Sequence, residues 1–387
     1  MFLKCFGFGA RGQYPTVIED GARRQYPTVI EELCHRFSLA DLRKSTNNFD
    51  QNTAIGRGGC GRVYKGCLQH NEDASEYTVA VKRYNAVEEE EGFRNEIELL
   101  CQLRHPNLVS LIGFCNDQKE KIIVYEYLSN GSLDQLLRSG VLSWKKRLEI
   151  CIGAARGLHY LHAGAKRTII HRDIKPRAIL LDDNMEPKLA DFDLSIQGAH
   201  FKSKPKPIKV DCVAGTLGYL AIEHVTDLTV TDKTDVYSFG MVLLQVVCGG
   251  KYLMRPLETE SLEKPLEEKI DGIIEGSIAP ECWQVFIDII RKCVKYEAHE
   301  RPTMGEVEVE LEHALSLQEQ ADITNNINQQ WVKLEADERP TMGEVKVELE
   351  HALSLQALAD RVNTNCHYTL MSKTVIIPGR KESQDSE

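Results

Sequence analysis

Residues 171 to 175 read HRDIK, and the pair DF stands at positions 191 and 192, eighteen residues after Asp173. In a loop, the Asp173 carboxylate can accept a proton from a hydroxyl group, and the ammonium group of Lys175 can neutralise a phosphoryl group in transfer. The second carboxylate, that of Asp191, can hold a magnesium ion. These residue types in this order predict a site for phosphoryl transfer, provided that other segments supply a nucleotide pocket.

A glycine-rich stretch upstream fits such a pocket. Residues 55 to 63 match G-x-G-x-x-G-x-V and contain Ile55, Gly56, Gly58, Gly61 and Val63. Glycines let the backbone lie against phosphate groups because no Cβ stands in the way. A dinucleotide-binding turn would continue into a helix, whereas residues 62 to 65 are typical of a strand, with a turn expected at Gly66. This favours a hairpin over a nucleotide, and a glycine-rich surface hairpin is the alternative.

A lysine and a glutamate follow at positions that suit an ion pair. Residues 79 to 82 read VAVK, and strand alternation places Ala80 and Lys82 on one face, where a small side chain admits a flat ring and the ammonium reaches phosphate oxygens. Phe93, Ile97 and Leu100 mark an amphipathic helix with Glu96 on its flank. A buried lysine needs a carboxylate, so we expect Lys82 and Glu96 to pair. Taken singly, each would be an ordinary surface charge.

The periodicity changes from strands to helices along the chain. Residues 77 to 84 and 121 to 127 have the alternating or β-branched pattern of strands. After Asn130-Gly131 the spacing becomes helical, and Ser143 is a plausible cap for the helix that follows. Residues 235 to 248 are apolar nearly all round, which indicates a helix buried in a large lobe.

With these motifs in one order, the sequence resembles the eukaryotic protein kinase family over roughly residues 50 to 316, including Asp235 at the start of the buried helix and Arg301 near the end. The resemblance implies an α+β, bilobal fold with a β-rich N-lobe carrying one regulatory helix and a mainly helical C-lobe. It implies ATP and Mg²⁺, or Mn²⁺, as cofactors. Asp173, Lys175, Lys82 and Glu96 would be catalytic, and Asp191 would bind the metal.

The finer resemblance is to plant receptor-like cytoplasmic kinases, carried by residues 37 to 49 and 235 to 240. Lys175 and Gly215-Thr216 are more similar to serine/threonine kinases than to tyrosine kinases. By this resemblance Tyr125 would guard the back of the pocket, Glu126 and Tyr127 would offer backbone groups to adenine, and Leu180 would form its floor.

Three positions depart from the family pattern. Ala178 stands where the family has an asparagine that ligates the second magnesium ion. Asp193 replaces the glycine after Asp191-Phe192, so it either hinders the loop or recruits a cation as a further metal ligand. Ile222 replaces a proline, although Glu223 can still pair with Arg301. Losing one group that stabilises the transition state costs roughly 10² to 10³ in rate, so phosphotransfer is expected to be impaired.

Full serine/threonine kinase activity and an ATP-binding pseudokinase scaffold are the alternatives. The segment 201 to 209, FKSKPKPIK, is either a basic activation loop or a solvated run of charge. In the first case a phosphate on Ser203 would pair with nearby lysines or with Arg172, and Thr216, Glu223 and Arg301 would complete the regulatory residues.

Composition limits the partners. The 387 residues carry 47 Lys and Arg against 58 Asp and Glu, a net charge of −11, which argues against a nucleic-acid partner. The resemblance to protein kinases implies a protein substrate or a receptor- or immune-type signalling partner. The twelve cysteines include no C-x-x-C pair, so reduced thiols and a cytoplasmic location are expected, without a zinc site or a disulfide framework. No apolar run reaches the roughly 20 residues of a membrane span. Phe2 excludes myristoylation, and acylation of Cys5 would give weak association with the inner face of the plasma membrane.

Two duplications lie near the ends. Residues 13 to 19 recur as 25 to 31, and residues 300 to 318 recur as 338 to 356 with one change. Val345, Leu349 and Ala352 keep helical spacing, so the second copy either folds back as a helix or hangs loose. The expected organisation is an N-terminal tail (1–37), a helix before the kinase (38–50), an N-lobe (51–128), a C-lobe (129–316) and a partly disordered C-terminal extension (317–387).

Overall fold

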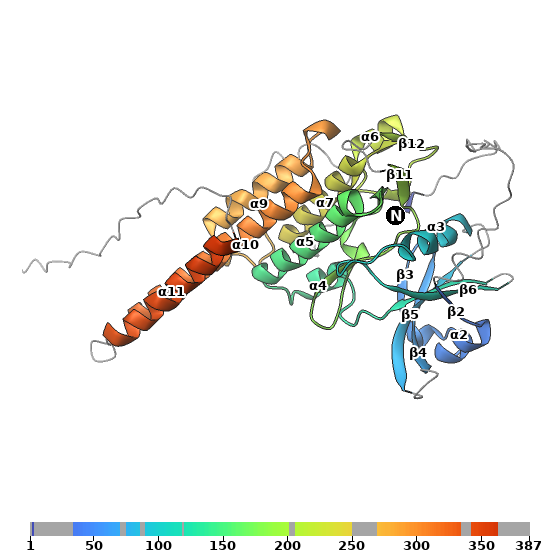
Figure 1. The fold of residues 1–387 in the computed structure, drawn as a ribbon, viewed down its shortest axis with the longest axis horizontal. Coiled ribbons are helices and arrows are strands. Elements are labelled where there is room, and N and C mark those ends of the chain that lie inside the picture. Colours follow the sequence, from blue (N-terminus) through green and yellow to red (C-terminus); the bar gives the residue numbers. More distant parts are fainter. Residues whose placement is uncertain are drawn as a thin grey trace, which may run out of the picture. The chain divides into compact units, whose positions relative to one another are not determined.

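The computed structural model describes residues 2–3, 34–69, 75–85, 90–117, 120–200, 206–249, 269–333 and 342–362. The chain divides into two compact units, Met1–Ile323 and Thr324–Glu387. The first unit contains a sheet lobe and a helical lobe (Figure 1). The α+β architecture expected from the change in periodicity is therefore confirmed.

A six-stranded sheet forms the N-lobe, in the order β2-β6-β7-β5-β4-β3. Its strands are β2 (His35–Arg36), β3 (Ala54–Arg57), β4 (Gly61–Gln69), β5 (Glu76–Tyr84), β6 (Leu111–Asp117) and β7 (Glu120–Glu126). Only β2 and β6 run parallel to each other within this sheet. The two predicted strands are confirmed as β5 and β7. They pair with Lys82 opposite Ile123 and Ala80 opposite Tyr125.

The turn predicted at Gly66 is wrong. Strand β4 continues through this residue to Gln69, and Gly66 pairs with Val79 of β5. A Cβ at Gly66 would lie 3.1 Å from the Ser45 side-chain oxygen, in helix α2 (Leu39–Ser45). The same Cβ would lie 3.1 Å from a methyl group of Val81 and 3.2 Å from one of Val79 on β5. The glycine therefore makes room both for α2 and for side chains of the neighbouring strand, which the local sequence does not show.

Two helices accompany this sheet. Helix α2 is shorter than the predicted range of 38 to 50, and its first turn is capped by Ser38, whose side chain accepts from the Asp41 N–H. Helix α3 (Glu90–Leu100) buries Phe93, Ile97 and Leu100, as its amphipathic pattern predicts.

The C-lobe is mainly helical, with helices α4 (Leu133–Ser139), α5 (Trp144–His159), α6 (Ile222–Asp227), α7 (Asp232–Cys248), α9 (Pro280–Cys293) and α10 (Met304–Lys333). All of these except α6 contribute buried residues to one apolar core. Ser143 caps α5, as predicted, through a bond from the Lys146 N–H. Helix α7 is buried over nearly its whole surface, which is also as predicted, but it begins at Asp232, so Asp235 lies within its first turn.

The segments between these helices contain short strands that pair in two-stranded ladders. They pair β8 (Arg167–Ile170) with β11 (Ile196–His200), β9 (Ile179–Leu181) with β10 (Pro187–Leu189), β12 (Ile208–Lys209) with β14 (Thr229–Val230), and β1 (Phe2–Leu3) with β13 (Gly215–Thr216). The β9–β10 ladder follows the HRDIK segment and leads to Asp191, so it holds the two predicted halves of the site in order.

One cysteine pair departs from the expectation of reduced thiols. A disulfide bond joins Cys34 to Cys101, whose Cα atoms are 6.5 Å apart. Cys34 precedes β2 and Cys101 follows α3, so the two meet because β2 runs along β6 beside that helix. Their separation of 67 residues leaves no spacing signal in the sequence.

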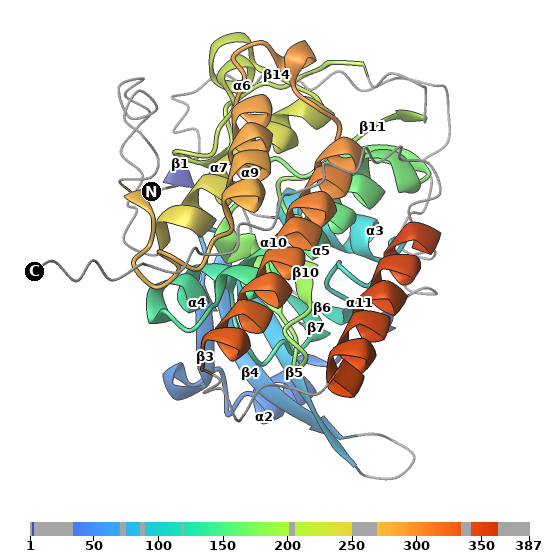
Figure 2. The same ribbon diagram turned by 90° about the vertical axis from the view of Figure 1, so that its left-hand side faces the viewer.

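The second unit contains helix α11 (Met342–Val362), coloured red in Figures 1 and 2. The helical pattern of the second sequence copy is therefore confirmed. Among the helices that the structure describes, none has both the length and the apolar character needed to cross a bilayer. Most of the N-terminal tail and the end of the C-terminal extension, from residue 363 on, lie outside the described residues.

Candidate active site

A cavity of about 880 Å³ lies between the sheet and the helical lobe. All the residues predicted to bind nucleotide line it: Ile55, Gly56, Gly58, Gly61, Val63, Ala80, Lys82, Tyr125, Glu126, Tyr127 and Leu180. The catalytic candidates Glu96, Asp173 and Lys175 and the two carboxylates of Asp191 and Asp193 line the same cavity. The fold thus brings both predicted halves of the site together, while their roles in binding and transfer stay predictions.

The predicted pair of Lys82 and Glu96 forms in the buried part of this cavity. The Lys82 ammonium lies 2.8 Å from the Glu96 carboxylate and 3.6 Å from that of Asp191. Burial is the largest single influence and would lower the pKa of Lys82, but Glu96 together with Tyr84, Tyr125 and Asp193 outweighs it, so the pKa is raised well above its usual value. Tyr84 donates its hydroxyl to the same Glu96 oxygen at 2.6 Å, so the carboxylate is held from two sides.

Helix α3 is also bonded to the segment around Asp191. The other Glu96 oxygen accepts the Phe192 N–H at 3.2 Å. The Asn95 amide donates to the Ser195 carbonyl at 2.6 Å. Asp191 itself has a positive φ of 67°, in the left-handed region that costs a non-glycine residue energy. The segment that directly follows Asp191 is thus held against α3 by contacts to its backbone.

Asp173 stands at the base of the cavity with a defined set of donors. The Thr216 hydroxyl donates to one of its oxygens at 2.6 Å, and the Lys175 ammonium binds the other. Lys175 also donates to the Thr216 hydroxyl oxygen at 3.1 Å. Burial raises the pKa of Asp173, although Lys175 and Thr216 oppose the rise. An ionised carboxylate held in this way has the geometry and charge of a proton acceptor.

Asp235 orients the loop that carries Asp173. It is fully buried in the first turn of α7, and its two oxygens accept the N–H groups of His171 at 2.7 Å and Arg172 at 2.9 Å. His162 contributes a third bond at 2.9 Å. Arg172 has a positive φ of 69°, so these bonds hold a strained turn in place. The Asp235 side chain thus positions the loop from a helix that lies far along the chain.

Two of the three departures from the family pattern, Ala178 and Asp193, differ in their surroundings. Ala178 is fully buried and presents a methyl group, which cannot ligate a metal. The Asp193 carboxylate accepts a bond from the Cys60 thiol of the glycine-rich loop at 2.6 Å. Burial would raise the pKa of Asp193, but Lys82 and this thiol lower it overall, so the group is an anion. Asp193 does not have positive φ, so its Cβ introduces no left-handed strain here.

The donor set at this end of the cavity suits a hard cation in part. Asp191 and Asp193 supply the carboxylate oxygens that Mg²⁺ takes together with phosphate oxygens. Within the residues that the structure describes, no group of three or more His, Cys, Asp or Glu side chains is arranged to hold a metal ion without such help. Phosphate oxygens of a bound nucleotide and water are the ligands that would complete the coordination of a Mg²⁺ ion here.

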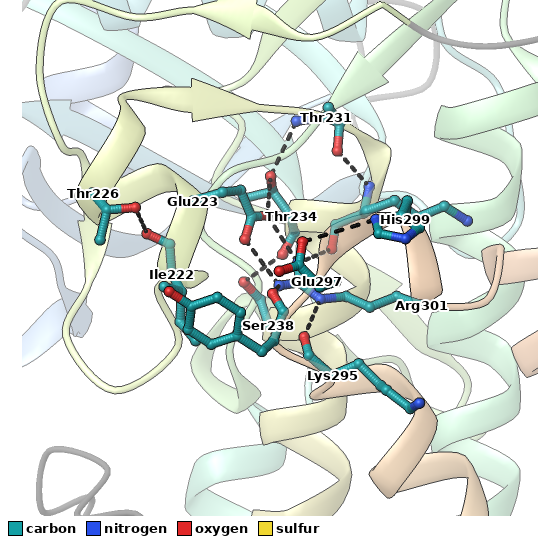
Figure 3. Close-up of polar contacts among 12 residues, drawn as sticks. Ile222, Glu223, Thr226, Thr231, Thr234, Ser238, Lys295, Glu297, His299 and Arg301 are labelled. Carbon is teal, nitrogen blue, oxygen red and sulfur yellow. Dashed lines mark hydrogen bonds and ion pairs between the residues drawn. The ribbon is translucent and has the colours of Figure 1, made fainter.

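The predicted contact between Glu223 and Arg301 also forms (Figure 3). The Arg301 guanidinium is fully buried and makes two bonds to the Glu223 carboxylate, at 2.8 and 2.9 Å. Glu223 also accepts the Thr234 hydroxyl at 3.1 Å. Ile222 forms the first turn of α6 in the place of the expected proline, and the neighbouring ion pair is retained.

Sequence reasoning missed several residues of the site, and two predicted ones cannot be placed. Tyr84, Asn95 and Cys60 make contacts in the site that no sequence motif predicts. For Cys60, its position inside the glycine-rich loop could have indicated that it lies in the site. Ser203 and Cys5 lie outside the described residues.

A sheet lobe and a helical lobe that enclose a paired lysine, a carboxylate beside it and a second buried aspartate at the base of the cavity define a protein kinase fold. The family described as protein tyrosine and serine/threonine kinase matches residues 49–311. The chain therefore belongs to this protein kinase family.

Relatives with similar kinase segments are plant receptor-like protein kinases. The chain is 44% identical to the receptor-like protein kinase ANXUR2 of Arabidopsis thaliana over 306 residues, which cover 75% of this chain and 35% of that protein. It is 42% identical to the receptor-like protein kinase FERONIA of the same plant over 306 residues, covering 75% of this chain and 33% of that protein. The chain thus spans about a third of the length of these relatives.

Proposed function

We propose that this chain binds ATP with Mg²⁺, or Mn²⁺, in the cavity between its lobes and acts in plant signalling as a protein kinase-fold protein whose phosphotransfer to serine or threonine is impaired. The observation that carries the proposal is the arrangement at one cavity: the Lys82–Glu96 pair and Asp173 are built as a transfer site needs them, whereas position 178 offers only a methyl group.

The residues of the chain would act in a defined order. Lys82, held by Glu96, would bind phosphate oxygens of the nucleotide, and the glycine-rich loop would cover them. Asp173 would accept the proton of the substrate hydroxyl at the oxygen that now accepts the Thr216 bond. Lys175, beside it, would neutralise charge on the transferred group.

Asp191 and Asp193 would hold the magnesium ion, which when bound neutralises charge on the phosphates. Asp193 would have to leave the Cys60 thiol to take part. Because Ala178 supplies no ligand, one position of the family's metal site is lost, and loss of such a group costs roughly 10² to 10³ in rate. Asp193 would recover part of this loss if its carboxylate takes over.

Two further functions are alternatives to impaired phosphotransfer. A fully active serine/threonine kinase is supported by the intact contacts of Asp173. A scaffold without catalysis is supported by the buried Ala178, and in that case the bound nucleotide would stiffen a surface read by a receptor- or immune-type partner. We further propose a cytoplasmic location, because the relatives' names place their kinase segments in receptor-like proteins.

The deciding experiment measures phosphate transfer and nucleotide binding on the same protein. Transfer of labelled phosphate to the protein itself and to a generic substrate is followed with Mg²⁺ and with Mn²⁺, and the unfolding temperature is recorded with and without nucleotide. We expect a clear rise in unfolding temperature and slow transfer. Unchanged melting with nucleotide would refute nucleotide binding, and transfer at the rate of an active kinase would refute impairment.

The variants Ala178→Asn and Asp193→Gly test the diagnosis residue by residue. If Ala178 is the lesion, Ala178→Asn raises the transfer rate roughly 10²-fold. If Asp193 supplies the missing ligand, Asp193→Gly lowers the remaining rate. The variant Asp173→Asn is the control for transfer by this site, since it removes the proton acceptor without changing the shape of the side chain.

A further inference from the structure

The chain carries its last kinase segment twice. Residues 300–318 recur as residues 338–356, and the only difference is Glu308 in the first copy against Lys346 in the second. The likeness continues backward into 294–299 and 332–337. The first copy is part of the folded C-lobe. Because the second copy has nearly the same sequence, it carries the side chains that would fit the same C-lobe surface.

The first copy is seated on the C-lobe by a buried ion pair (Figure 3). Arg301 binds the Glu223 carboxylate through two nitrogens and also donates to the carbonyl oxygens of Lys295 at 2.7 Å and Lys233 at 3.0 Å. Its guanidinium lies 5.0 Å from the centre of the Tyr237 ring. This pocket is built for one arginine at one position relative to the helix that follows.

Helix α10 continues the contact with an apolar stripe. Met304, Val307, Leu311 and Ala314 are each at most 1% exposed against the C-lobe core. At the end of the segment, the Gln318 amide accepts the Ala279 N–H at 2.9 Å and donates to the Ser277 carbonyl at 3.0 Å. Apolar packing and fixed polar bonds together specify the register of this segment on the C-lobe.

The second copy repeats every one of these side chains at the same spacing: Arg339, Met342, Val345, Leu349, Ala352 and Gln356. In the structure, α11 leaves the equivalent stripe largely uncovered. Met342 is 82% exposed where Met304 is 1%, and Leu349 is 60% exposed where Leu311 is fully buried. An amphipathic helix with an open apolar stripe matches a surface that already binds the same sequence.

We propose that residues 338–356 are a second ligand for the C-lobe surface that holds residues 300–318, and that they take this surface within the same chain when the first copy leaves it. The two copies then compete for one site. Either of these two segments of the chain can therefore occupy the surface, one at a time.

The positions at which the copies differ set the direction of this competition. Just before the first copy, Tyr296 is 68% exposed and the His299 side chain is 80% exposed, so their replacement by Leu334 and Asp337 before the second copy leaves the buried contacts unchanged. The remaining difference, Glu308 against Lys346, lies at a position whose side chain makes a contact in the first copy. Glu308 lies 2.8 Å from His159 and 3.4 Å from Arg156.

Lysine at that position would face the Arg156 cation with a like charge. Seating the second copy also closes a longer loop after α9, which costs entropy that grows slowly with length. Both effects favour the first copy, so the second is the reserve ligand and is bound in a minor fraction of molecules.

The test places one charge in each apolar stripe of the full-length chain. Leu311→Asp destroys the first copy as a ligand, Leu349→Asp destroys the second, and the third variant carries both. We expect Leu349→Asp to melt like the wild type, Leu311→Asp to lose no more than about 5 °C, and the double variant to lose about 10 °C or more. If Leu311→Asp falls as far as the double variant, or fails to fold, the second copy does not replace the first and the proposal is overturned.

Matched controls lie on the opposite side of the same helices. Val309 and Val347 are both 65% exposed, so Val309→Asp and Val347→Asp should leave the unfolding temperature unchanged. The exchange of ligand also predicts an effect of the single differing position. Lys346→Glu should raise the unfolding temperature of the Leu311→Asp variant and leave that of the wild type unchanged.

Hydrogen exchange supplies a readout that a general change in stability would not move. Peptides from the two copies differ in mass at Glu308 and Lys346. In Leu311→Asp the slow exchange of the first copy should transfer to the second, and continued fast exchange of residues 342–356 would contradict the proposal. Light scattering at two protein concentrations should give a monomer. A dimer of Leu311→Asp would show that a second molecule supplies the ligand, which would refute exchange within one chain.

Discussion

The Glu96→Gln substitution tests the buried ion pair on which the site depends. Glu96 is fully buried and accepts bonds from the Lys82 ammonium, the Tyr84 hydroxyl and the Phe192 N–H. A glutamine keeps the size of the side chain but replaces one acceptor oxygen with a donor, so at least one of these three donors loses its partner. Lys82, only 6% exposed, then keeps Asp191 at 3.6 Å as its nearby carboxylate among the described residues.

The expected loss follows from this geometry. Removing one partner of a buried ion pair costs about 3 to 5 kcal/mol, because the remaining charge is left without compensation. Asp191 moderates the loss, so we expect the lower end, about 3 kcal/mol, and a fall in unfolding temperature of about 6 °C or more. The pKa of Lys82 should fall as well, since Glu96 is the largest influence that raises it.

Thermal unfolding followed by circular dichroism, with and without nucleotide and Mg²⁺, measures this effect. The matched control is Glu98→Gln on the same helix, which makes the same chemical change at a partly exposed side chain and should shift the unfolding temperature by less than about 1 °C. If Glu96→Gln melts within about 2 °C of the wild type, the pair does not stabilise the fold and the argument from its burial is wrong.

Three further predictions concern single groups. Burial lowers the pKa of His224 to about 4, below its usual value of 6.5, so between these pH values the unfolded state binds more protons than the folded state. Acidification from pH 6.5 to 4 should therefore lower the free energy of unfolding by about 2 kcal/mol once solvent screening is allowed for. His224→Asn should remove this pH dependence of stability in urea unfolding. The Thr216 bond lowers the pKa of Asp173, so Thr216→Val should move the acid limb of the kcat/KM profile to higher pH, and an unmoved limb would argue against Asp173 as the base. Cys60→Ala releases Asp193 from the 2.6 Å thiol contact and should tighten binding of nucleotide with Mg²⁺ about three- to tenfold in a calorimetric titration, whereas weaker binding would show that the thiol helps the bound state.

The strand and helix assignments show where sequence reasoning works and where it stops. Strand β5 and helices α3 and α5 were predictable because their apolar residues repeat with the period of the element they form. Helix α7 was predictable because its sequence is apolar nearly all round. Gly66 was misjudged as a turn because the groups that leave no room for a side chain there, Ser45 of α2 and Val79 and Val81 of β5, lie outside any local window. The Cys34–Cys101 bond was missed because the two thiols meet only through the sheet order.

The candidate site divides in the same way. The types and order of Lys82, Glu96, Asp173 and Asp191 could be predicted from the sequence, because the chemistry of phosphoryl transfer needs these groups. The contacts that surround each group could not be predicted. The bond from Cys60 to Asp193 spans 133 residues, and that from Thr216 to Asp173 spans 43, so neither follows from spacing.

The sequence by itself therefore determined which chemical groups the protein can bring to a nucleotide, the periods of its main elements and the presence of two nearly identical terminal segments. Only the tertiary structure decided which carboxylate faces which donor, which cysteines meet, and which apolar stripe of the two copies is covered. The physical reason is range: side-chain periodicity acts over a few residues, whereas burial, ion pairing and pKa depend on neighbours that the fold brings from far along the chain.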